Sequence, residues 1–231
     1  MNKPVEGGLR ILAISDLHGL HFKTASDLID DLRPDWIVLC GDLLPDFGKI
    51  PGVGNRLQAQ REFWQAYRRT FIRDFAVTTL VRGNHEIEGF QDPALCRLPA
   101  ELDGHVVRLE GVPAEFGTWG WSREWQDDHL ERELYDQLRE APEPWIYISH
   151  VPPYGCLDTT KVGEQVGHRP LARHLQGLGW PNALVLCGHV HESFGSMKRD
   201  QTLIVNAACG YVLIEWDKDG SRVITSGIVE E

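Results

Sequence analysis

The sequence predicts an α/β (α+β) protein in which two β-sheets pack as a sandwich with helices on the outside. Two observations support this fold class. Five apolar runs of strand length alternate with helical patterns along most of the 231-residue chain, and the runs are nearly continuous. Such runs are typical of βαβ units whose strands are buried on both faces. The C-terminal third changes to short strand patterns separated by turns, which indicates β-hairpins.

The elements follow in order along the chain. Strands are expected at residues 9–15, 36–40, 77–81, 145–149 and 183–187. Apolar residues at helical spacing predict helices over 24–32, 56–75, 127–140 and 170–178. The last strand patterns are "SFGSMKR", "TLIVNAA", "GYVLIEWD" and "RVITSGIV", with "DKDG" as a hairpin turn. The sequence shows no repeat, low-complexity tract or linker, so residues 1–231 are predicted to form a single domain.

Composition limits the classes of partner. The net charge of −11 does not favour long nucleic acid or an anionic membrane, so an anionic substrate would need a local reversal of charge. Five cysteines, odd in number and without a CxxC pattern, favour reduced thiols. The N-terminus lacks a secretory leader pattern, and no apolar run approaches the ~18 residues that span a bilayer. We expect a cytoplasmic protein that does not enter membranes.

Polar residues of metal-binding type follow each of the five predicted parallel strands. The segments are "DLHG", "GD", "GNHE", "H" and "GHVH". Each alone is an ordinary turn or a buried histidine. Together they fall where α/β sheets form their sites, at the carboxyl ends of strands. The candidate ligands are Asp16, His18, Asp42, Asn84, His150, His189 and His191.

Seven ligands are too many for one tetrahedral ion and suit two divalent ions that share a carboxylate. Two such ions can clamp the attacking and leaving oxygens of an in-line displacement at phosphorus. The mixture of oxygen and imidazole ligands favours Mn, Fe, Zn or Co over Mg, Ca or Cu(I), and we expect Mn²⁺. The ions would also give this acidic chain a local positive charge that attracts phosphate.

The series "DLH…GD…GNHE…H…GHVH" resembles the calcineurin-like metallophosphoesterases, whose fold is a four-layer β-sandwich flanked by helices. The resemblance implies that Asp16, His18 and His191 hold one metal, that Asn84, His150 and His189 hold the other, and that Asp42 bridges them. It also implies a bridging hydroxide as the nucleophile. His85 would steady the phosphate and act as the general acid.

Two features of the sequence narrow the resemblance to one part of this family. Protein Ser/Thr phosphatases carry a "GDxxDR" pattern, in which the second aspartate orients the catalytic histidine and the arginine holds phosphate. Here the chain reads "GDLLPDFGK", so Asp46 comes one place late and no arginine follows. The segments "HVPPYGCLD" and "CGHVHE" instead resemble a small subfamily with HxPPxGxxD and CGHxHE signatures, described as phosphoesterases or cyclic-nucleotide phosphodiesterases.

Some neighbouring residues suggest supporting roles. Glu86 and Glu192 follow candidate ligands and could orient imidazoles. His168, Arg169 and Arg173 surround a helix start, where an anion could bind. The tryptophan-rich segment 117–125 could pack in the core, stack a nucleobase or support a homodimer.

The sequence therefore predicts a metal-dependent phosphoric ester hydrolase that contains two metal ions. The leading hypothesis is a phosphodiesterase acting on a small ester, such as a cyclic nucleotide or another phosphodiester. The alternatives are a phosphomonoesterase on a small phosphate ester and a non-catalytic metal-binding scaffold.

Overall fold

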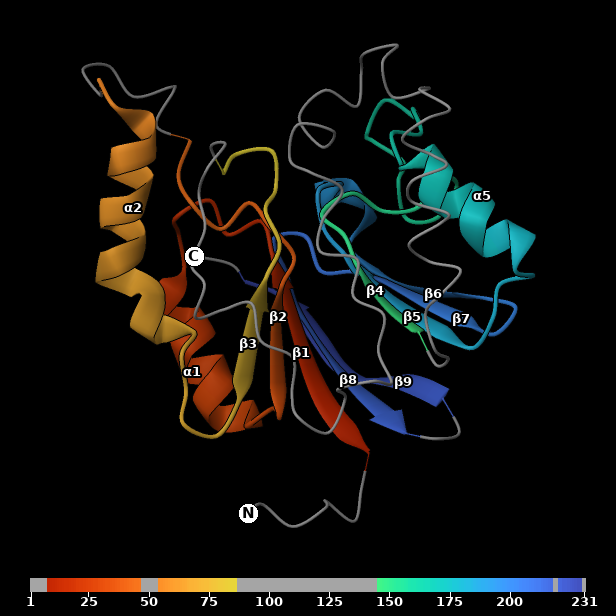
Figure 1. Ribbon diagram of the computed structural model, residues 1–231, viewed down its shortest axis with the longest axis horizontal. Coiled ribbons are helices and arrows are strands. Elements are labelled where there is room, and N and C mark those ends of the chain that lie inside the picture. Colours follow the sequence, from red (N-terminus) through yellow and green to blue (C-terminus); the bar gives the residue numbers. More distant parts are fainter. Residues whose placement is uncertain (1–7, 47–53, 87–144, 218–219, 230–231) are drawn as a thin grey trace.

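The computed structural model has the two packed sheets that the sequence predicts (Figure 1). It describes residues 8–46, 54–86, 145–217 and 220–229. The first sheet has the strand order β3-β2-β1-β8-β9, and the second has the order β4-β5-β7-β6. The strands are β1 (Leu9–Ser15), β2 (Trp36–Leu39), β3 (Val77–Leu80), β4 (Trp145–Ile148), β5 (Ala183–Cys187), β6 (Gly195–Arg199), β7 (Thr202–Asn206), β8 (Gly210–Asp217) and β9 (Gly220–Ile228).

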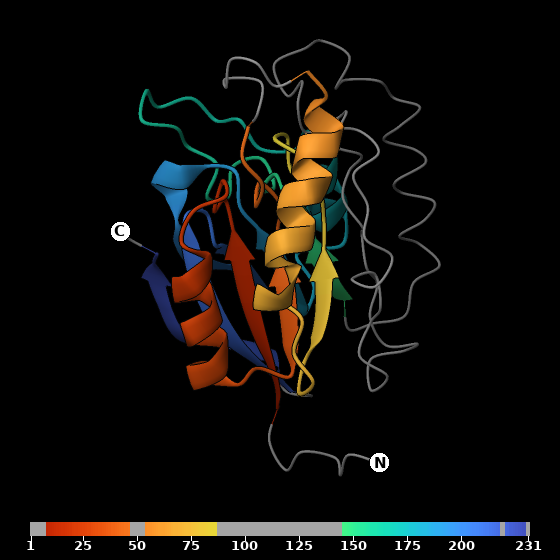
Figure 2. The same cartoon turned by 90° about the vertical axis from the view of Figure 1, so that its left-hand side faces the viewer.

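Helices cover the outer faces of the two sheets. Helices α1 (Phe22–Leu32) and α2 (Arg56–Tyr67) lie on one side of the molecule, and α5 (Arg169–Gly177) lies on the other. Figure 2 shows α1 and α2 on the near face of the sheet that contains β1 and β3. The predicted helix 127–140 and the tryptophan-rich segment 117–125 lie outside the described residues. Among the helices that the structure describes, none is long and apolar enough to cross a membrane.

Three buried clusters hold these layers together. In β1, Ile11 and Ala13 join a cluster between the two sheets, whereas Leu12 and Ile14 join the cluster beneath α1 and α2. A third cluster packs α5 against the outer face of the second sheet. Alternate residues of one strand thus face opposite layers, which explains why β1 reads as a continuous apolar run.

The helix predicted over 56–75 is shorter than expected. Helix α2 ends at Tyr67, and a short 3-10 turn, η2 (Arg68–Thr70), follows it. The Thr78 hydroxyl donates to the Phe71 carbonyl at 2.7 Å, so a β3 side chain binds the backbone beyond the helix. Phe71 still packs in the cluster beneath the helices. The apolar spacing therefore predicted the burial of Trp64 and Phe71 but not the exposure of Tyr67 or the helix length.

The C-terminal strands form the predicted hairpins. Strand β8 pairs antiparallel with both β1 and β9, so the chain end extends the first sheet. Strands β6 and β7 pair antiparallel in the second sheet, beside the parallel pair of β5 and β7.

His168 connects α5 to the loop that follows β4. Its imidazole accepts a hydrogen bond from the Leu171 amide at 3.2 Å and so caps the helix. Its own amide donates to the Pro152 carbonyl at 2.7 Å. Burial lowers the pKa of His168 to about 4.

This depressed pKa predicts a pH-dependent stability. Between the ordinary histidine pKa of about 6.5 and about 4, the unfolded chain binds a proton at His168 that the folded chain excludes. The contribution is therefore complete above pH 6.5 and is lost as the pH falls toward 4. We expect the free energy of unfolding, measured by urea titration, to fall less between pH 7 and pH 4.5 in His168→Asn, which keeps a capping side chain. Equal losses in the variant and the wild type would contradict this assignment.

Candidate metal centre

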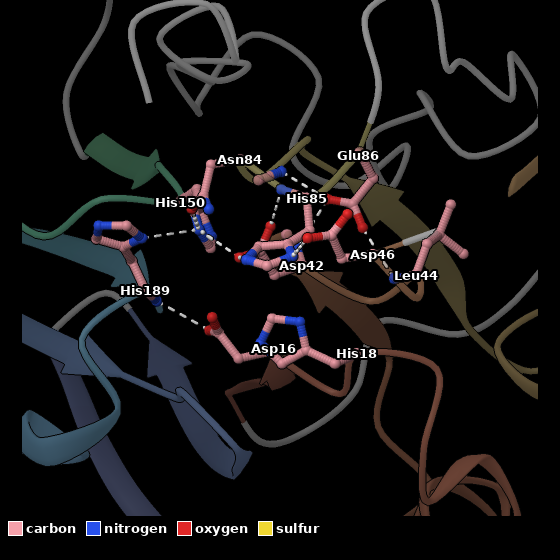
Figure 3. Close-up of polar contacts among 12 residues, drawn as sticks. Asp16, His18, Asp42, Leu44, Asp46, Asn84, His85, Glu86, His150 and His189 are labelled. Atoms are coloured by element: carbon pink, nitrogen blue, oxygen red, sulfur yellow. Dashed lines mark hydrogen bonds and ion pairs between the residues drawn. The ribbon is translucent and has the colours of Figure 1, made fainter. Parts of the chain in front are cut away.

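The carboxyl ends of β1 to β5 meet at one edge of the sandwich and bring together all seven candidate ligands. Figure 3 shows Asp16, His18, Asp42, Asn84, His150 and His189 at this edge. The loops that follow β1, β2 and β3 supply residues from the first sheet. The loops that follow β4 and β5 supply residues from the second. Strands β1 and β5 contact each other across the sandwich, which explains why two different sheets can contribute to one site.

One group of donors comprises Asp16, His18 and His191. Their ligand atoms all lie within 4.8 Å of one another. His191 Nε2 is 3.3 Å from Asp16 Oδ1 and 3.4 Å from His18 Nε2. Asp16 is buried, whereas His191 is exposed, so this group is open to solvent on one side.

A second group comprises Asp42, His150 and His189, and it also lies within 4.8 Å. His150 Nε2 is 3.3 Å from Asp42 Oδ2, 3.2 Å from His189 Nδ1 and 2.9 Å from Asn84 Oδ1. The His150 Nδ1 atom faces the Cys40 carbonyl at 2.8 Å. This contact fixes the ring so that Nε2 points into the site.

Backbone strain marks the same residues. Asp16, His18, Asp42 and His189 all have φ between 50° and 71°, a conformation that costs energy for non-glycine residues and clusters at functional sites. Two glycines allow the loops to approach. A side chain at Gly83 would overlap Asp42, and one at Gly188 would overlap Ser15 and Asp16. The "GNH" and "GH" segments therefore need glycine for close packing.

Each buried aspartate divides its oxygens between a backbone amide and an imidazole. Asp16 Oδ2 accepts from the His189 amide at 2.9 Å, and Oδ1 faces His191. Asp42 Oδ1 accepts from the His85 amide at 2.7 Å, and Oδ2 faces His150. Burial opposes ionisation of both carboxyl groups. The neighbouring imidazoles nevertheless hold the pKa of each below its ordinary value.

The imidazoles respond to the same charges. Burial would lower the pKa of His150, but Asp42 and Asp16 raise it to about 10. The hydrogen bond to Asp16 raises the pKa of His191 to about 10. Burial and the neighbouring His150 lower the pKa of His189 to about 4.

Glu86 binds backbone amides rather than imidazoles. Its carboxylate accepts from Asp42 at 2.7 Å, Leu44 at 2.9 Å and Gly83 at 2.7 Å. Burial and the charge of Asp42 raise the pKa of Glu86 to about 7 despite these donors. Glu86 thus joins the loops that follow β2 and β3. Glu192 instead forms an exposed ion pair with Lys161 at 3.6 Å.

His85 lies between two carboxylates, and with His18 and Asp42 it forms a third group whose ligand atoms lie within 4.8 Å of one another. Its Nε2 atom is 3.8 Å from Asp42 Oδ2, and its Nδ1 atom is 3.7 Å from Asp46 Oδ2. Asp46 in turn accepts a hydrogen bond from Arg56 at 3.0 Å. Asp46 comes one place later than the second aspartate of the "GDxxDR" pattern, but it still lies close to His85. The Nδ1 atom is buried and has no hydrogen bond to a described residue.

Sequence reasoning missed Gln60, a fully buried residue of α2. Its amide donates to the His85 carbonyl at 2.6 Å and to the Pro45 carbonyl at 3.2 Å. Gln60 therefore connects the outer helix to the loops that carry His85 and Asp46. Its only sequence signal was a polar side chain on the apolar side of the predicted helix, three residues after Leu57 and four before Trp64.

Asp158, from the HxPPxGxxD signature, shapes its own loop. It is buried and accepts from the amides of Gly155 and Gly167, each at 3.0 Å. The aspartate that ends this signature therefore stabilises the conformation of its own loop.

A cavity of about 490 Å³ opens over the two donor groups. Its described lining contains no lysine or arginine and consists of His18, Asp42, Asp46, Asn84, His85, His189 and His191. Arg169 and Arg173 line a different cavity.

The donor chemistry fits divalent metal ions. Carboxylate and imidazole groups converge, and two of the carboxylates are buried, so cations at this site would compensate their charge. The absence of thiolate among these donors agrees with ions that prefer oxygen and nitrogen. Metal binding would displace the protons that the raised pKa values keep on His150 and His191.

Comparisons with known proteins agree with this architecture. The chain is 24% identical over 208 residues to an uncharacterized protein of Methanocaldococcus jannaschii, covering 86% of this chain and 87% of that protein. It is 28% identical over 169 residues to the human metallophosphoesterase domain-containing protein 1, covering 71% of this chain and 51% of that protein. A dimetal phosphatase from Danio rerio superposes with a TM-score of 0.61 at 11% identity, covering 96% and 97% of the two chains.

The family model for calcineurin-like phosphoesterases matches residues 9–193, which contain every candidate ligand. This match covers most of the chain and extends from the start of β1 to the end of the loop that carries His189 and His191. The protein therefore belongs to the calcineurin-like phosphoesterase family and is a metal-dependent phosphoric ester hydrolase.

Proposed function

We propose that this protein is a two-metal phosphodiesterase that hydrolyses a small phosphodiester, such as a cyclic nucleotide. The observation that carries the proposal is the meeting of two donor groups around Asp42, with His85 at their edge. The chain's charge of −11 argues against long nucleic acid. The cavity of about 490 Å³ suits a small ligand.

Asp16, His18 and His191 would hold one ion, and Asn84, His150 and His189 would hold the other. Asp42 would bridge the two, because it contacts His150 of the second group and lies within the same 4.8 Å limit of His18. The structural neighbour from Danio rerio is a dimetal phosphatase, which supports a two-metal assignment for this chain. We propose Mn²⁺ as the ion, with Fe, Zn and Co as the alternatives that the same donors accept.

When bound, the two ions would polarise the phosphoryl oxygens and activate the attacking water. The protein's own residues would protonate the leaving group. His85 Nε2 faces the site and would donate a proton to the departing ester oxygen. Asp46 would accept the Nδ1–H of the doubly protonated ring after a small closing movement from 3.7 Å, so that Nε2 carries the proton it donates. Arg56 holds Asp46 in place.

Apart from the metal ions, the side chains around the cavity favour a diester over a monoester. A phosphodiester carries one negative charge near pH 7, whereas a monoester carries about −1.5 to −2. Among the described residues, the cavity lining offers no arginine or lysine to a second charge, and it includes the Asp46 carboxylate. A monoanionic ester whose second arm extends into the cavity therefore matches the site better.

Removal of a ligand should remove metal and activity together. We expect Asp42→Ala to lose both ions and His191→Ala to lose at least one, because each supplies a donor that the rest of its group does not replace. Metal content after dialysis and ester hydrolysis should be measured together. His21→Ala is the matched control, since His21 does not line the cavity. Full metal content in Asp42→Ala would contradict the bridging role.

Loss of the proton donor should separate metal binding from turnover. We expect His85→Ala to retain metal and to lose about 10²–10⁴-fold in kcat. Asp46→Asn should retain metal and lose about 10–100-fold, because it acts through the orientation of His85. Steady-state kinetics with a chromogenic ester would measure both losses. Normal turnover in metal-loaded His85→Ala would exclude the assigned role.

A paired assay tests the substrate class. The protein is stripped of metal and reloaded with Mn²⁺, and hydrolysis of a chromogenic phosphodiester is compared with that of its phosphomonoester. His85→Ala serves as the blank. We expect faster cleavage of the diester, absent in the blank. Faster cleavage of the monoester would replace this proposal with a phosphomonoesterase, and bound metal with no cleavage of either would favour the scaffold alternative.

A further inference from the structure

A second cavity lies beside α5, apart from the metal centre. Its volume is about 390 Å³, and it is bounded by the loop after β4, the exposed side of α5 and the end of β6. The residues that matter most are Tyr154, Arg169, Arg173, Trp180 and Arg199. None of them lines the cavity over the donor groups.

Two of its arginines are held by aromatic rings. The Arg169 guanidinium lies 4.1 Å from the centre of the Tyr154 ring, and that of Arg199 lies 4.2 Å from the centre of the Trp180 ring. Trp180 is buried and packs in the cluster beneath α5, so the ring under Arg199 is fixed. Stacking restricts each guanidinium plane and leaves its edge N–H groups available.

Neither Arg169 nor Arg199 is paired with a carboxylate of a described residue. Within the described parts of the chain, Arg169 and Arg199 form no ion pair, and the Arg199 Nη1 atom contacts only the weak acceptor Cys156 Sγ, at 3.6 Å. The described lining of this cavity contains no aspartate or glutamate. In a protein of net charge −11, this is a local concentration of positive charge.

We propose that Arg169 and Arg199 form a second anion-binding site, which takes the phosphate group of a small phosphorylated molecule. Two planar guanidiniums present paired N–H donors that match the oxygens of a phosphate group. The cavity is large enough for a molecule of nucleotide size. Arg173 also lines it, but Arg169 and Arg199 alone supply two positive charges.

The site is linked to the catalytic loops through the backbone. Tyr154 follows the ligand His150 in the same loop, and its amide donates to the His168 carbonyl at 3.2 Å. His168 caps α5, whose first residue is Arg169. The cavity and the metal centre therefore share one loop but no lining residue.

Isothermal titration calorimetry of the Mn²⁺-loaded protein with inorganic phosphate tests this site. We expect Arg169→Gln/Arg199→Gln to lose one phosphate site relative to the wild type, whatever the metal centre binds. Each single variant should weaken that site by about tenfold or more, as expected for a lost charge-assisted hydrogen bond. The matched control is Arg222→Gln, which removes an exposed arginine from β9 and should keep every site.

A second arm identifies the ligand and locates it. AMP is titrated into His85→Ala, with and without the two arginine substitutions, and hydrogen exchange is followed over residues 169–177 and 195–199. Tighter binding of AMP than of phosphate, with protection of both segments, indicates a ligand of mononucleotide size. Equal binding indicates recognition of the phosphate group alone. Unchanged phosphate and AMP binding in the double variant, with thermal unfolding matching the wild type, would overturn the proposal.

Discussion

The site depends on two buried aspartates that each bind the backbone of another loop. Asp16 accepts the amide of His189 from the second sheet, and Asp42 accepts the amide of His85 from the neighbouring strand. Each uses its remaining oxygen to face an imidazole. An unpaired buried carboxylate is costly, so these contacts require the loops after β1, β2, β3 and β5 to meet closely.

The glycines, the strained residues and Glu86 follow from that requirement. Gly83 and Gly188 leave room where a side chain would collide with an aspartate. Glu86 supports the loop of Asp42 through three amides. The positive φ angles of Asp16 and Asp42 persist because these hydrogen bonds and the surrounding strands determine the loop geometry.

Much of this arrangement could be predicted from the sequence. Continuous apolar runs place buried strands well because both faces of β1 and β2 pack against other layers. Ligand types that recur directly after those runs predict convergence, because parallel strands end at the same edge of a sheet. The division of the ligands between two metals, which the resemblance to the family implies, stays a prediction.

The remaining features depend on contacts that no local pattern contains. Asp46 lies 3.7 Å from His85, although it comes one place later than the second aspartate of the "GDxxDR" pattern. Gln60 reaches the same loop from a helix that precedes it by 25 residues. Beyond the end of α2, the Phe71 carbonyl accepts a hydrogen bond from Thr78 in the following strand. These are tertiary constraints, which override helical spacing and motif register.

The position of bound metal tests the two-metal arrangement most directly. A crystal of the Mn²⁺-loaded protein would give anomalous difference peaks at the ions. We expect two peaks about 3.5–4 Å apart, with the Asp42 carboxylate between them and one donor group around each. A single peak, or two peaks that do not share Asp42, would contradict the arrangement.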